Sequence, residues 1–145
     1  MKRLMTLALV VFVAAISACA GDDKPISFSE LPQNTQAFIN QYFPGQNVAF
    51  VKVDTDFLDK EYEVIFTSGD KAEFDANGEW KELKCTFSQV PTDCVPNEIS
   101  EYISKTFPDT KIIEIERDTK KTEVKISTGI EIEFDKNYNV IEIDN

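Results

Sequence analysis

The chain has 145 residues, 42% hydrophobic and 28% charged, which suits a globular protein of about one domain and argues against disorder. It has no histidine, which excludes Ser-His-Asp and Cys-His catalysis and any histidine-ligated zinc or iron site. With 26 acidic and 15 basic residues its net charge is -11, which disfavours nucleic acid as a partner because phosphates require a basic surface.

The N-terminus resembles a bacterial export signal. Lys2 and Arg3 precede an apolar run, residues 4–16, that is too short to span a hydrocarbon core of about 30 Å. Residues 16–19, Ile-Ser-Ala-Cys, resemble a lipobox, whose cysteine is lipidated and becomes the mature N-terminus. We therefore expect a signal peptide with lipobox over residues 1–19, lipidation at Cys19 and a flexible tether over residues 20–27. The alternative is ordinary signal-peptidase cleavage after Ala20.

The rest of the chain contains an internal repeat. Leu31-Pro32 and Phe43-Pro44 recur, both at the same offset, as Val95-Pro96 and Phe107-Pro108. The Glu-Phe-Asp triplet of residues 73–75 recurs as residues 133–135, at a slightly smaller offset, so the first copy holds a short insertion between Asp54 and Glu61. The pattern predicts one structural domain with a first αβ4 repeat over residues 28–85, a linker over 86–94 and a second αβ4 repeat over 95–145.

Each repeat is predicted to begin with a helix of about three turns, bounded by the two Pro motifs. Positions at helical spacing form one face of each helix. These positions are Thr35, Phe38, Ile39 and Tyr42 in the first repeat and Ile99, Tyr102, Ile103 and Thr106 in the second. So short a helix is unstable alone and must pack on a sheet.

An antiparallel meander of four strands is predicted after each helix, and three of the four are marked by clear β-rich segments. Strands are expected around residues 47–54, 62–67 and 80–85, and around residues 111–118, 130–134 and 140–143, with hairpin turns at Ser68-Gly69 and Asn77-Gly78. The predicted fold class is α+β: a tandem αβ4 repeat with an antiparallel eight-stranded sheet and short helices on one face.

Two cysteines, Cys85 and Cys94, bracket the linker between the repeats. In an oxidising compartment they are predicted to form a disulfide. The alternative is a pair of buried free thiols. A redox pair is disfavoured because no C-x-x-C spacing occurs.

The repeated order of motifs resembles the PepSY-like lipoproteins, whose tandem units are similar in fold to the β-lactamase-inhibitor protein. The resemblance covers about residues 28–144. It implies one open sheet face that grips a partner protein, and it carries no catalytic residue across. The second repeat departs from the first at Tyr138, where the first has Gly78, and at Val140, where the first has Trp80.

Acidic residues suggest two kinds of chemistry. The acidic segment 54–61 lacks the Gly and Glu of an EF-hand, so no metal site and no cofactor are predicted and a solvated loop is expected. Alternating glutamates are expected on one sheet face of the second repeat, and these are Glu114, Glu116, Glu131, Glu133 and Glu142. Such a face is usually solvated, and it could attract a cationic partner or hold a carboxylate pair for hydrolysis.

An apolar patch is the predicted partner-binding site. If Trp80 faces outward with Ile65, the two lie near Phe57 and Leu58 of the acidic loop and form a hot spot. The alternative is that Trp80 packs in the core.

The sequence thus predicts an exported, lipid-anchored, non-enzymatic binding protein that uses the open sheet face to recognise another protein with a basic or apolar surface. Inhibition of a secreted hydrolase is the form that the resemblance implies. The protein is expected at the outer membrane, facing the periplasm or the cell surface and attached through lipid alone. The alternative functions are a structural or envelope-maintenance lipoprotein with an acidic, ion-buffering surface, and an enzyme with paired carboxylates.

Overall fold

The computed structural model describes residues 23–56 and 58–145, so the predicted signal peptide, Cys19 and Phe57 lie outside the described residues. Within those two ranges, no helix combines the length and apolar character needed to span a membrane.

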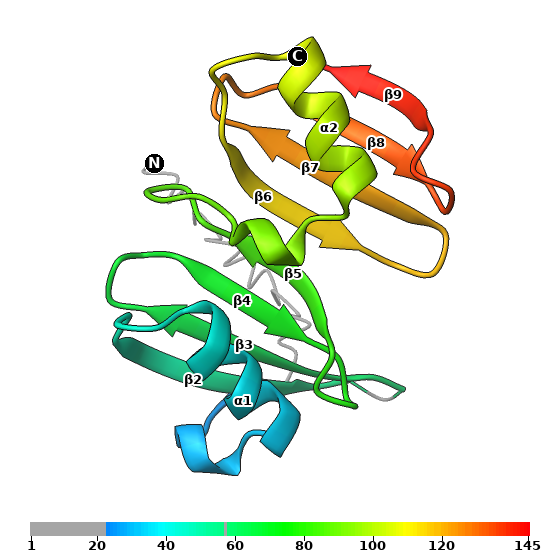
Figure 1. Cartoon of the computed structure of the whole chain (residues 1–145). Coiled ribbons are helices and arrows are strands. Elements are labelled where there is room, and N and C mark those ends of the chain that lie inside the picture. The colour runs from blue at the N-terminus through cyan, green and yellow to red at the C-terminus, as the bar shows by residue number, and fades with distance from the viewer. Residues whose placement is uncertain (1–22, 57) are drawn as a thin grey trace, which may run out of the picture.

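The strands of the described residues form one antiparallel sheet of nine, with neighbours in chain order (Figure 1). They are β1 (Lys24–Pro25), β2 (Val48–Thr55), β3 (Lys60–Phe66), β4 (Lys71–Phe74), β5 (Trp80–Lys84), β6 (Ile112–Arg117), β7 (Lys121–Ile126), β8 (Glu131–Asp135) and β9 (Val140–Asp144). The predicted count of eight is therefore corrected to nine. The extra strand is β1, whose Lys24 and Pro25 pair with Val53 and Lys52 at the edge of β2. A strand of two residues carries no periodic pattern, so the sequence did not reveal it.

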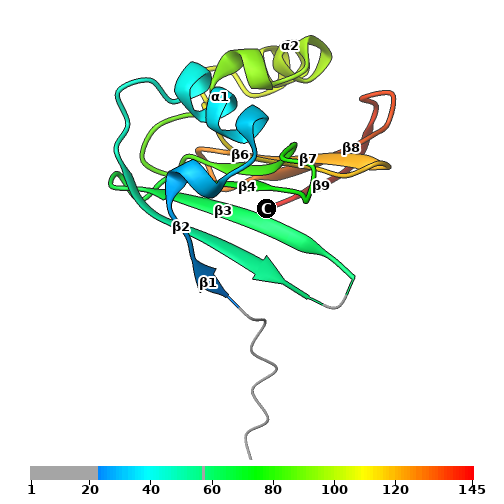
Figure 2. The ribbon, with the colours of Figure 1, turned by 90° about the horizontal axis from the view of Figure 1, so that it is seen from below.

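Two α-helices of the described chain, α1 (Gln33–Tyr42) and α2 (Asn97–Thr106), lie on the same face of the sheet (Figure 2). Short 3₁₀ turns precede them, η1 (Phe28–Glu30) and η2 (Thr92–Cys94). Pro32 and Pro96 occupy the N-cap positions, where a missing N–H is harmless, and the helices end before Phe43 and Phe107. The mixed helix-and-sheet fold with helices on one face is as predicted.

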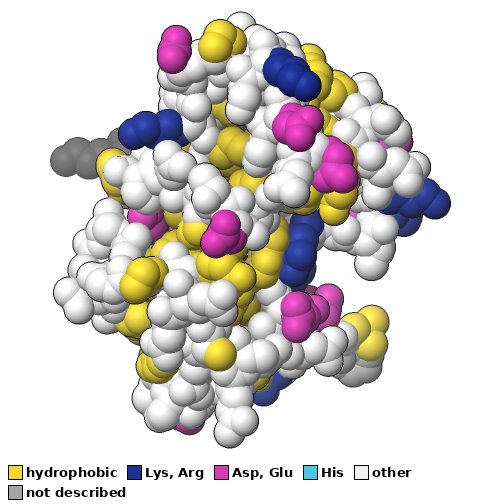
Figure 3. All heavy atoms as spheres, in the orientation of Figure 1, with side chains coloured by type: hydrophobic (Ala, Val, Ile, Leu, Met, Phe, Trp, Pro, Cys, Tyr) yellow, Lys and Arg dark blue, Asp and Glu magenta, His cyan; other side chains and the backbone are white. Residues whose placement is uncertain are grey.

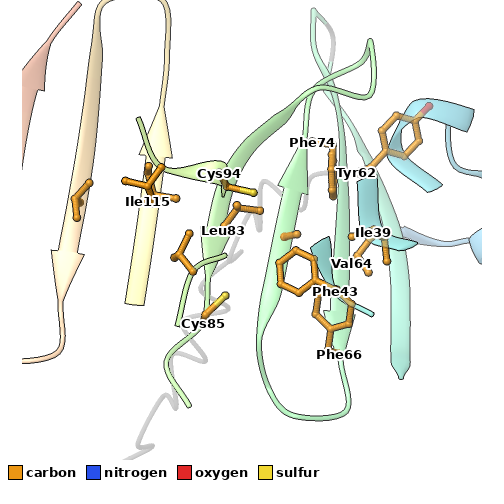
Figure 4. Packing of buried hydrophobic residues seen from close by; sticks show 14 of the residues in the cluster. Ile39, Phe43, Tyr62, Val64, Phe66, Phe74, Leu83, Cys85, Cys94 and Ile115 are labelled. Carbon is orange, nitrogen blue, oxygen red and sulfur yellow. The ribbon is translucent and has the colours of Figure 1, made fainter. Parts of the chain in front are cut away.

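Alternate residues of the inner strands point to the helices and form the core (Figure 4). Phe74, Leu83, Ile115 and Phe134 are fully buried. Leu83 pairs with Ile115 across the β5–β6 boundary, so one core runs through both halves of the sheet. On the helices, Thr35, Ile39, Ile99 and Ile103 are buried as predicted. Thr106 is exposed, contrary to prediction, because it is the last residue of α2.

Cys85 and Cys94 are both buried free thiols, so the predicted disulfide is not formed in this structure. Figure 4 shows the two side chains on either side of Leu83. Each cysteine is held by its own backbone contact, because the N–H of Cys85 donates to Ile113 O (2.7 Å) and that of Cys94 donates to Pro91 O (2.9 Å).

Both thiols are expected to be unreactive in the folded protein. Burial is the main cause that raises the pKa of Cys85 to about 12, and the nearby Asp70 carboxylate adds to it. Burial, followed by the charge of Asp93, raises the pKa of Cys94 to about 11. Because only a thiolate attacks an alkylating reagent, iodoacetamide at pH 8 should leave both cysteines unmodified until the protein is unfolded in urea. Peptide mapping by mass spectrometry measures this residue by residue. Rapid labelling of the folded protein, or a peptide pair linked through Cys85 and Cys94, would contradict it.

Candidate functional site

The open face of the sheet, opposite the helices, carries a line of carboxylates across the strands. In the described residues, seven glutamates, one from each strand from β3 to β9, are aligned by the strand register. They are Glu63, Glu73, Glu82, Glu116, Glu123, Glu133 and Glu142. We term this line the glutamate row. Lys52 continues it onto β2, opposite Glu63.

The glutamate row follows from strand alternation. In β3, Tyr62, Val64 and Phe66 are buried under the helices, so Glu63 between them must point to the other face. The same argument holds in β7, where Thr122, Val124 and Ile126 are buried and Glu123 is not. Directly opposed like charges destabilise a sheet, so the row has no role in holding the fold together.

Lysines form ion pairs with glutamates on both sides of the centre of the glutamate row. Lys71 Nζ lies 3.0 Å from Glu73 Oε1 and 3.8 Å from Glu63 Oε2. On the other side, Lys121 Nζ lies 2.7 Å from Glu133 Oε2. Burial alone would raise the pKa of Glu73, but the hydrogen bond and charge of Lys71 outweigh it and lower that pKa. The repulsion at Glu63, Glu73 and Glu133 is therefore partly offset.

The centre of the row has no such ion pair among the described residues, and the charges of Lys71 and Lys121 only partly offset the repulsion there. Among the described residues, Glu82, Glu116 and Glu123 form no ion pair with a lysine or arginine. Burial, a hydrogen bond with Glu114 and the charge of Glu73 raise the pKa of Glu82 to about 8. The pKa of Glu123 is also raised, by burial and by repulsion from Glu131 and Glu116. The strands β5, β6 and β7 thus share a site where negative charge is disfavoured and where a bound cation would favour the ionised carboxylates.

A hollow of about 160 Å³ lies at the β2–β4 end of the row. Its lining residues are Asp23, Lys52, Asp54, Glu61, Tyr62, Glu63 and Glu73. Lys52 Nζ lies 3.0 Å from Asp23 Oδ2, and this hydrogen bond is the main cause that raises the pKa of Lys52. Glu61 is bound by Lys81. The carboxylates of Asp23, Glu61, Glu63 and Glu73 thus form ion pairs, whereas Asp54 Oδ1 is buried without a hydrogen-bond partner among the described residues. Within the described chain no group of three or more acidic or cysteine side chains is arranged to hold a metal ion.

Trp80 does not face outward with Ile65. It pairs with Phe74 and packs against the buried cluster, as the alternative prediction held. A register shift between Glu73 and Phe74 explains this, because strict alternation along β5 no longer applies. The Arg117 guanidinium covers the Trp80 ring at 3.7 Å from its centroid, and Arg117 Nε donates to Trp80 O at 3.0 Å.

The predicted apolar patch is not brought together. Ile65 pairs with Phe50 and Lys71 near one end of the strands, whereas Trp80 lies near the other end. Leu58, 90% exposed, lies in the turn between β2 and β3 at the same end as Trp80, and a hollow of about 480 Å³ there is lined by both Asp59 and Trp80. Phe57 lies outside the described residues.

The helix side has a different character. Figure 3, in the orientation of Figure 1, shows hydrophobic atoms gathered between the two helical halves and only scattered charged side chains. The open face is therefore the side on which charge is organised into a regular pattern.

Sequence reasoning found Glu116, Glu133 and Glu142 but missed Glu63, Glu73, Glu82 and Glu123. The sequence held a signal, because the pairs Glu63/Glu123, Glu73/Glu133 and Glu82/Glu142 all share the offset at which the Glu-Phe-Asp triplet recurs. Alternating the buried positions in the first repeat would have placed its glutamates on the same face.

Comparison with known proteins agrees with this architecture. A solved structure of a "putative periplasmic protein from DUF2874 family" of Bacteroides vulgatus is 52% identical, with a TM-score of 0.84 over 87% of this chain and 99% of that chain. A "putative calcium-regulated periplasmic protein" of Bacteroides thetaiotaomicron is 48% identical, with a TM-score of 0.84 over 86% of this chain and 98% of that one.

A third structure, a "putative periplasmic protein of unknown function" of Bacteroides vulgatus, is 28% identical, with a TM-score of 0.80 over 85% of this chain and 99% of that one. No curated protein matches the sequence. The model of one family, described as "Putative beta-lactamase-inhibitor-like, PepSY-like", matches residues 60–142. Because this model covers more than half of the sequence, the chain belongs to the PepSY-like, β-lactamase-inhibitor-like family.

Proposed function

We propose that this protein is an exported, non-enzymatic binding protein that recognises a cationic surface of another protein through the open sheet face. The observation that carries the proposal is the centre of the glutamate row, where the described glutamates have no ion pair and their pKa values are raised. Glu82 and Glu116 lie directly opposite each other, and the pKa of Glu82 is raised to about 8. Lysine or arginine side chains of a partner would replace this repulsion with attraction and would speed association by electrostatic steering.

The cellular location and the domain organisation are part of this proposal. The similar structures from Bacteroides are described as periplasmic, which supports export. We propose that Cys19 anchors the protein by lipid at the outer membrane, and that residues 28–85 and 95–145 are duplicated αβ4 units joined by residues 86–94. Inhibition of a secreted hydrolase rests on the family's inhibitor-like description alone.

The earlier candidate residues have smaller parts in this proposal. Ile65 lies on the open face beside Lys71, so it can add apolar contact next to the glutamate row. Leu58 can contact the same partner only if the partner also reaches the β2–β3 turn. Trp80 is half-buried against the core, and we assign to it mainly the positioning of Arg117.

The test compares two variants that each replace two glutamates by glutamine, at pH 9, where Glu82 is ionised. The face variant carries Glu82→Gln and Glu116→Gln, and the control carries Glu98→Gln and Glu101→Gln on the exposed side of α2. Each is used as bait on envelope and culture-supernatant fractions, beside the wild type. We expect a partner that the wild type and the control retain and that the face variant loses, with retention falling as salt is raised. Equal retention by all three baits would refute a role for the row.

The second candidate is an acidic, ion-buffering surface, which the glutamate row and the description of one relative as calcium-regulated favour. Thermal melts with and without millimolar Ca²⁺ separate the two. A higher midpoint with Ca²⁺ in the wild type, absent in the face variant, would make calcium the occupant of the row. An unchanged midpoint leaves the protein partner as the occupant.

A further inference from the structure

The strand β9 forms an edge of the sheet that is rich in exposed apolar side chains. Tyr138, Val140, Ile141 and Ile143 are 36%, 38%, 56% and 47% exposed, and they make up four of the seven large hydrophobic side chains that are exposed in the described chain. Within the described residues, β9 pairs only with β8. An exposed edge with unpaired backbone groups is a template for a further strand.

The opposite edge of the sheet is covered by a short strand of the same chain. There, Lys24 and Pro25 of β1 pair with β2, and the N–H of Ile26 donates to Val51 O at 3.0 Å. Asp23 adds an ion pair to Lys52. The chain thus covers one edge with its own N-terminal segment and leaves the β9 edge without a strand from the described residues.

The inside of the molecule shows how a strand sits on an edge of this kind. β5 holds the place in the first half that β9 holds in the second, because Leu83 pairs with Ala72 of β4 as Ile143 pairs with Ile132 of β8. The far side of β5 is covered by β6. As a result Leu83 is 0% exposed, whereas Ile143 is 47% exposed.

The β5–β6 pairing also indicates the side chains that the β9 edge would accept. Opposite Leu83 lies the apolar Ile115, and opposite Lys84 lies Glu114, with Lys84 Nζ 3.2 Å from Glu114 Oε2. At the place of Lys84, β9 has Asp144, so the charge is reversed. An incoming strand therefore needs an apolar residue opposite Ile143 and a basic residue opposite Asp144.

The charge on the open face near this edge also favours a strand with basic side chains. A hollow beside β8 and β9 is lined by acidic residues, which are Glu123, Glu131, Glu133, Glu142 and Asp144. Glu131 Oε1 lies 2.6 Å from Lys125 Nζ, and Glu133 Oε2 lies 2.7 Å from Lys121 Nζ. Glu142, by contrast, has no ion pair with a described lysine or arginine. A second copy of this chain is a poor occupant, because its β9 would bring Glu142 and Asp144 against the same carboxylates.

We propose that the free edge of β9 binds an extended segment of a partner protein as an additional antiparallel strand, in which basic side chains alternate with apolar ones. Backbone hydrogen bonds to β9 would supply part of the affinity, and Glu142, Ile143 and Asp144 would select the side chains. This surface lies at the edge of the sheet and does not depend on the proposed role of the central glutamates.

The N–H of Ile143 is the group to test. Directly after β5 the N–H of Cys85 donates to Ile113 O of β6, so by strand alternation the N–H of Leu83 also faces β6. The equivalent N–H of Ile143 then faces the free edge. Proline is tolerated at such a position, so Ile143→Pro removes this donor while β9 stays paired with β8. Ile143→Ala is the matched control, since it shortens the side chain and keeps the N–H.

The probe is a blocked heptapeptide of alternating lysine and valine, added to the full chain and followed by fluorescence anisotropy and by hydrogen exchange of the β9 amides. We expect binding that slows exchange at Ile143, an affinity about tenfold weaker for Ile143→Pro, and a change of about threefold or less for Ile143→Ala. A heptapeptide of alternating glutamate and valine should not bind. Circular dichroism melts confirm that each variant is folded.

Other outcomes would overturn the proposal. The first is equal affinity of wild type and Ile143→Pro, and the second is equal loss in Ile143→Pro and Ile143→Ala, which would indicate a side-chain contact without an added strand. A dimer that forms with rising concentration and is lost in Ile143→Pro would make a second copy the occupant. Peptide binding that fails only in the Glu82→Gln, Glu116→Gln variant would place the peptide on the open face, which overturns this proposal and supports the other one.

Discussion

Replacing Gly78 by alanine is expected to lower the free energy of unfolding by about 3 kcal/mol. Gly78 has φ 81°, and a Cβ there would clash with Asn34 Oδ1 and would lie 2.6 Å from Thr35 Oγ1. The carbonyl of Gly78 also accepts a buried hydrogen bond from Thr35 Oγ1 at 3.0 Å. The new methyl group would push α1 away from the turn between β4 and β5 and weaken this bond. Urea denaturation at pH 7 measures the effect.

Tyr138 offers the matched control in the second half of the sheet. The turns at Gly78 and Tyr138 have the same hydrogen bonds. Asp75 Oδ1 accepts from the N–H groups of Asn77 and Glu79. In the same way, Asp135 Oδ1 accepts from the N–H groups of Asn137 and Asn139. Tyr138 already has φ 63° and is exposed. Tyr138→Ala should therefore cost only about 1 kcal/mol or less. Equal destabilisation by the two substitutions would contradict the proposed docking of α1 on Gly78.

Replacing Glu82 by glutamine is expected to stabilise the protein at pH 8 by about 2 kcal/mol, which is on the order of 8 °C in the melting midpoint. This is about half of what the full pKa difference implies, because Glu82 is only half-buried and solvent screens its charge. The pKa of Glu82 is about 8 in the folded state against 4.5 for the unperturbed group. Folding therefore favours the protonated carboxyl. The stability that this group contributes is fully present below pH 4.5 and is lost as the pH rises through about 8. Glutamine mimics the protonated form and removes the loss.

The gain from Glu82→Gln should therefore grow between pH 5 and pH 8 and be small at the lower end. Differential scanning calorimetry across this range measures it. Glu101→Gln is the control, because Glu101 is 72% exposed and has a single ion pair, to Lys105. This control should change the stability by about 0.5 kcal/mol or less at any pH. The same gain at pH 5 and pH 8 would mean that Glu82 carries no raised pKa.

The elements of this fold were readable from local signals. Pro32, Pro44, Pro96 and Pro108 bound the helices, and alternation within each strand indicates which side chains are buried. β1 could not be predicted, because Lys24 and Pro25 take part in the sheet only through the neighbouring edge of β2.

The site was only partly predictable. Alternation gave the face on which Glu116, Glu133 and Glu142 lie, but the alignment of glutamates from successive strands depends on register. Register between β5 and β6 is set where the two halves meet, and it brings Glu82 opposite Glu116, although α2 and the linker separate the two in the chain. Register also determines the direction of the Trp80 side chain, because the register shift between Glu73 and Phe74 turns this side chain towards the core. The two cysteines bracket a short segment, yet Leu83 lies between their side chains (Figure 4).

Titration of the glutamate side chains by carbon-detected NMR, with and without a cationic partner, tests the central claim most directly. In the free protein, the resonance of Glu82 should titrate near pH 8, well above the range of an ordinary glutamate. When the partner binds, the midpoint should fall by more than one pH unit, because new positive charge favours the carboxylate. If every glutamate of the row titrates in the ordinary range, or if the midpoint of Glu82 does not move on binding, the centre of the open face is not a cation-binding surface.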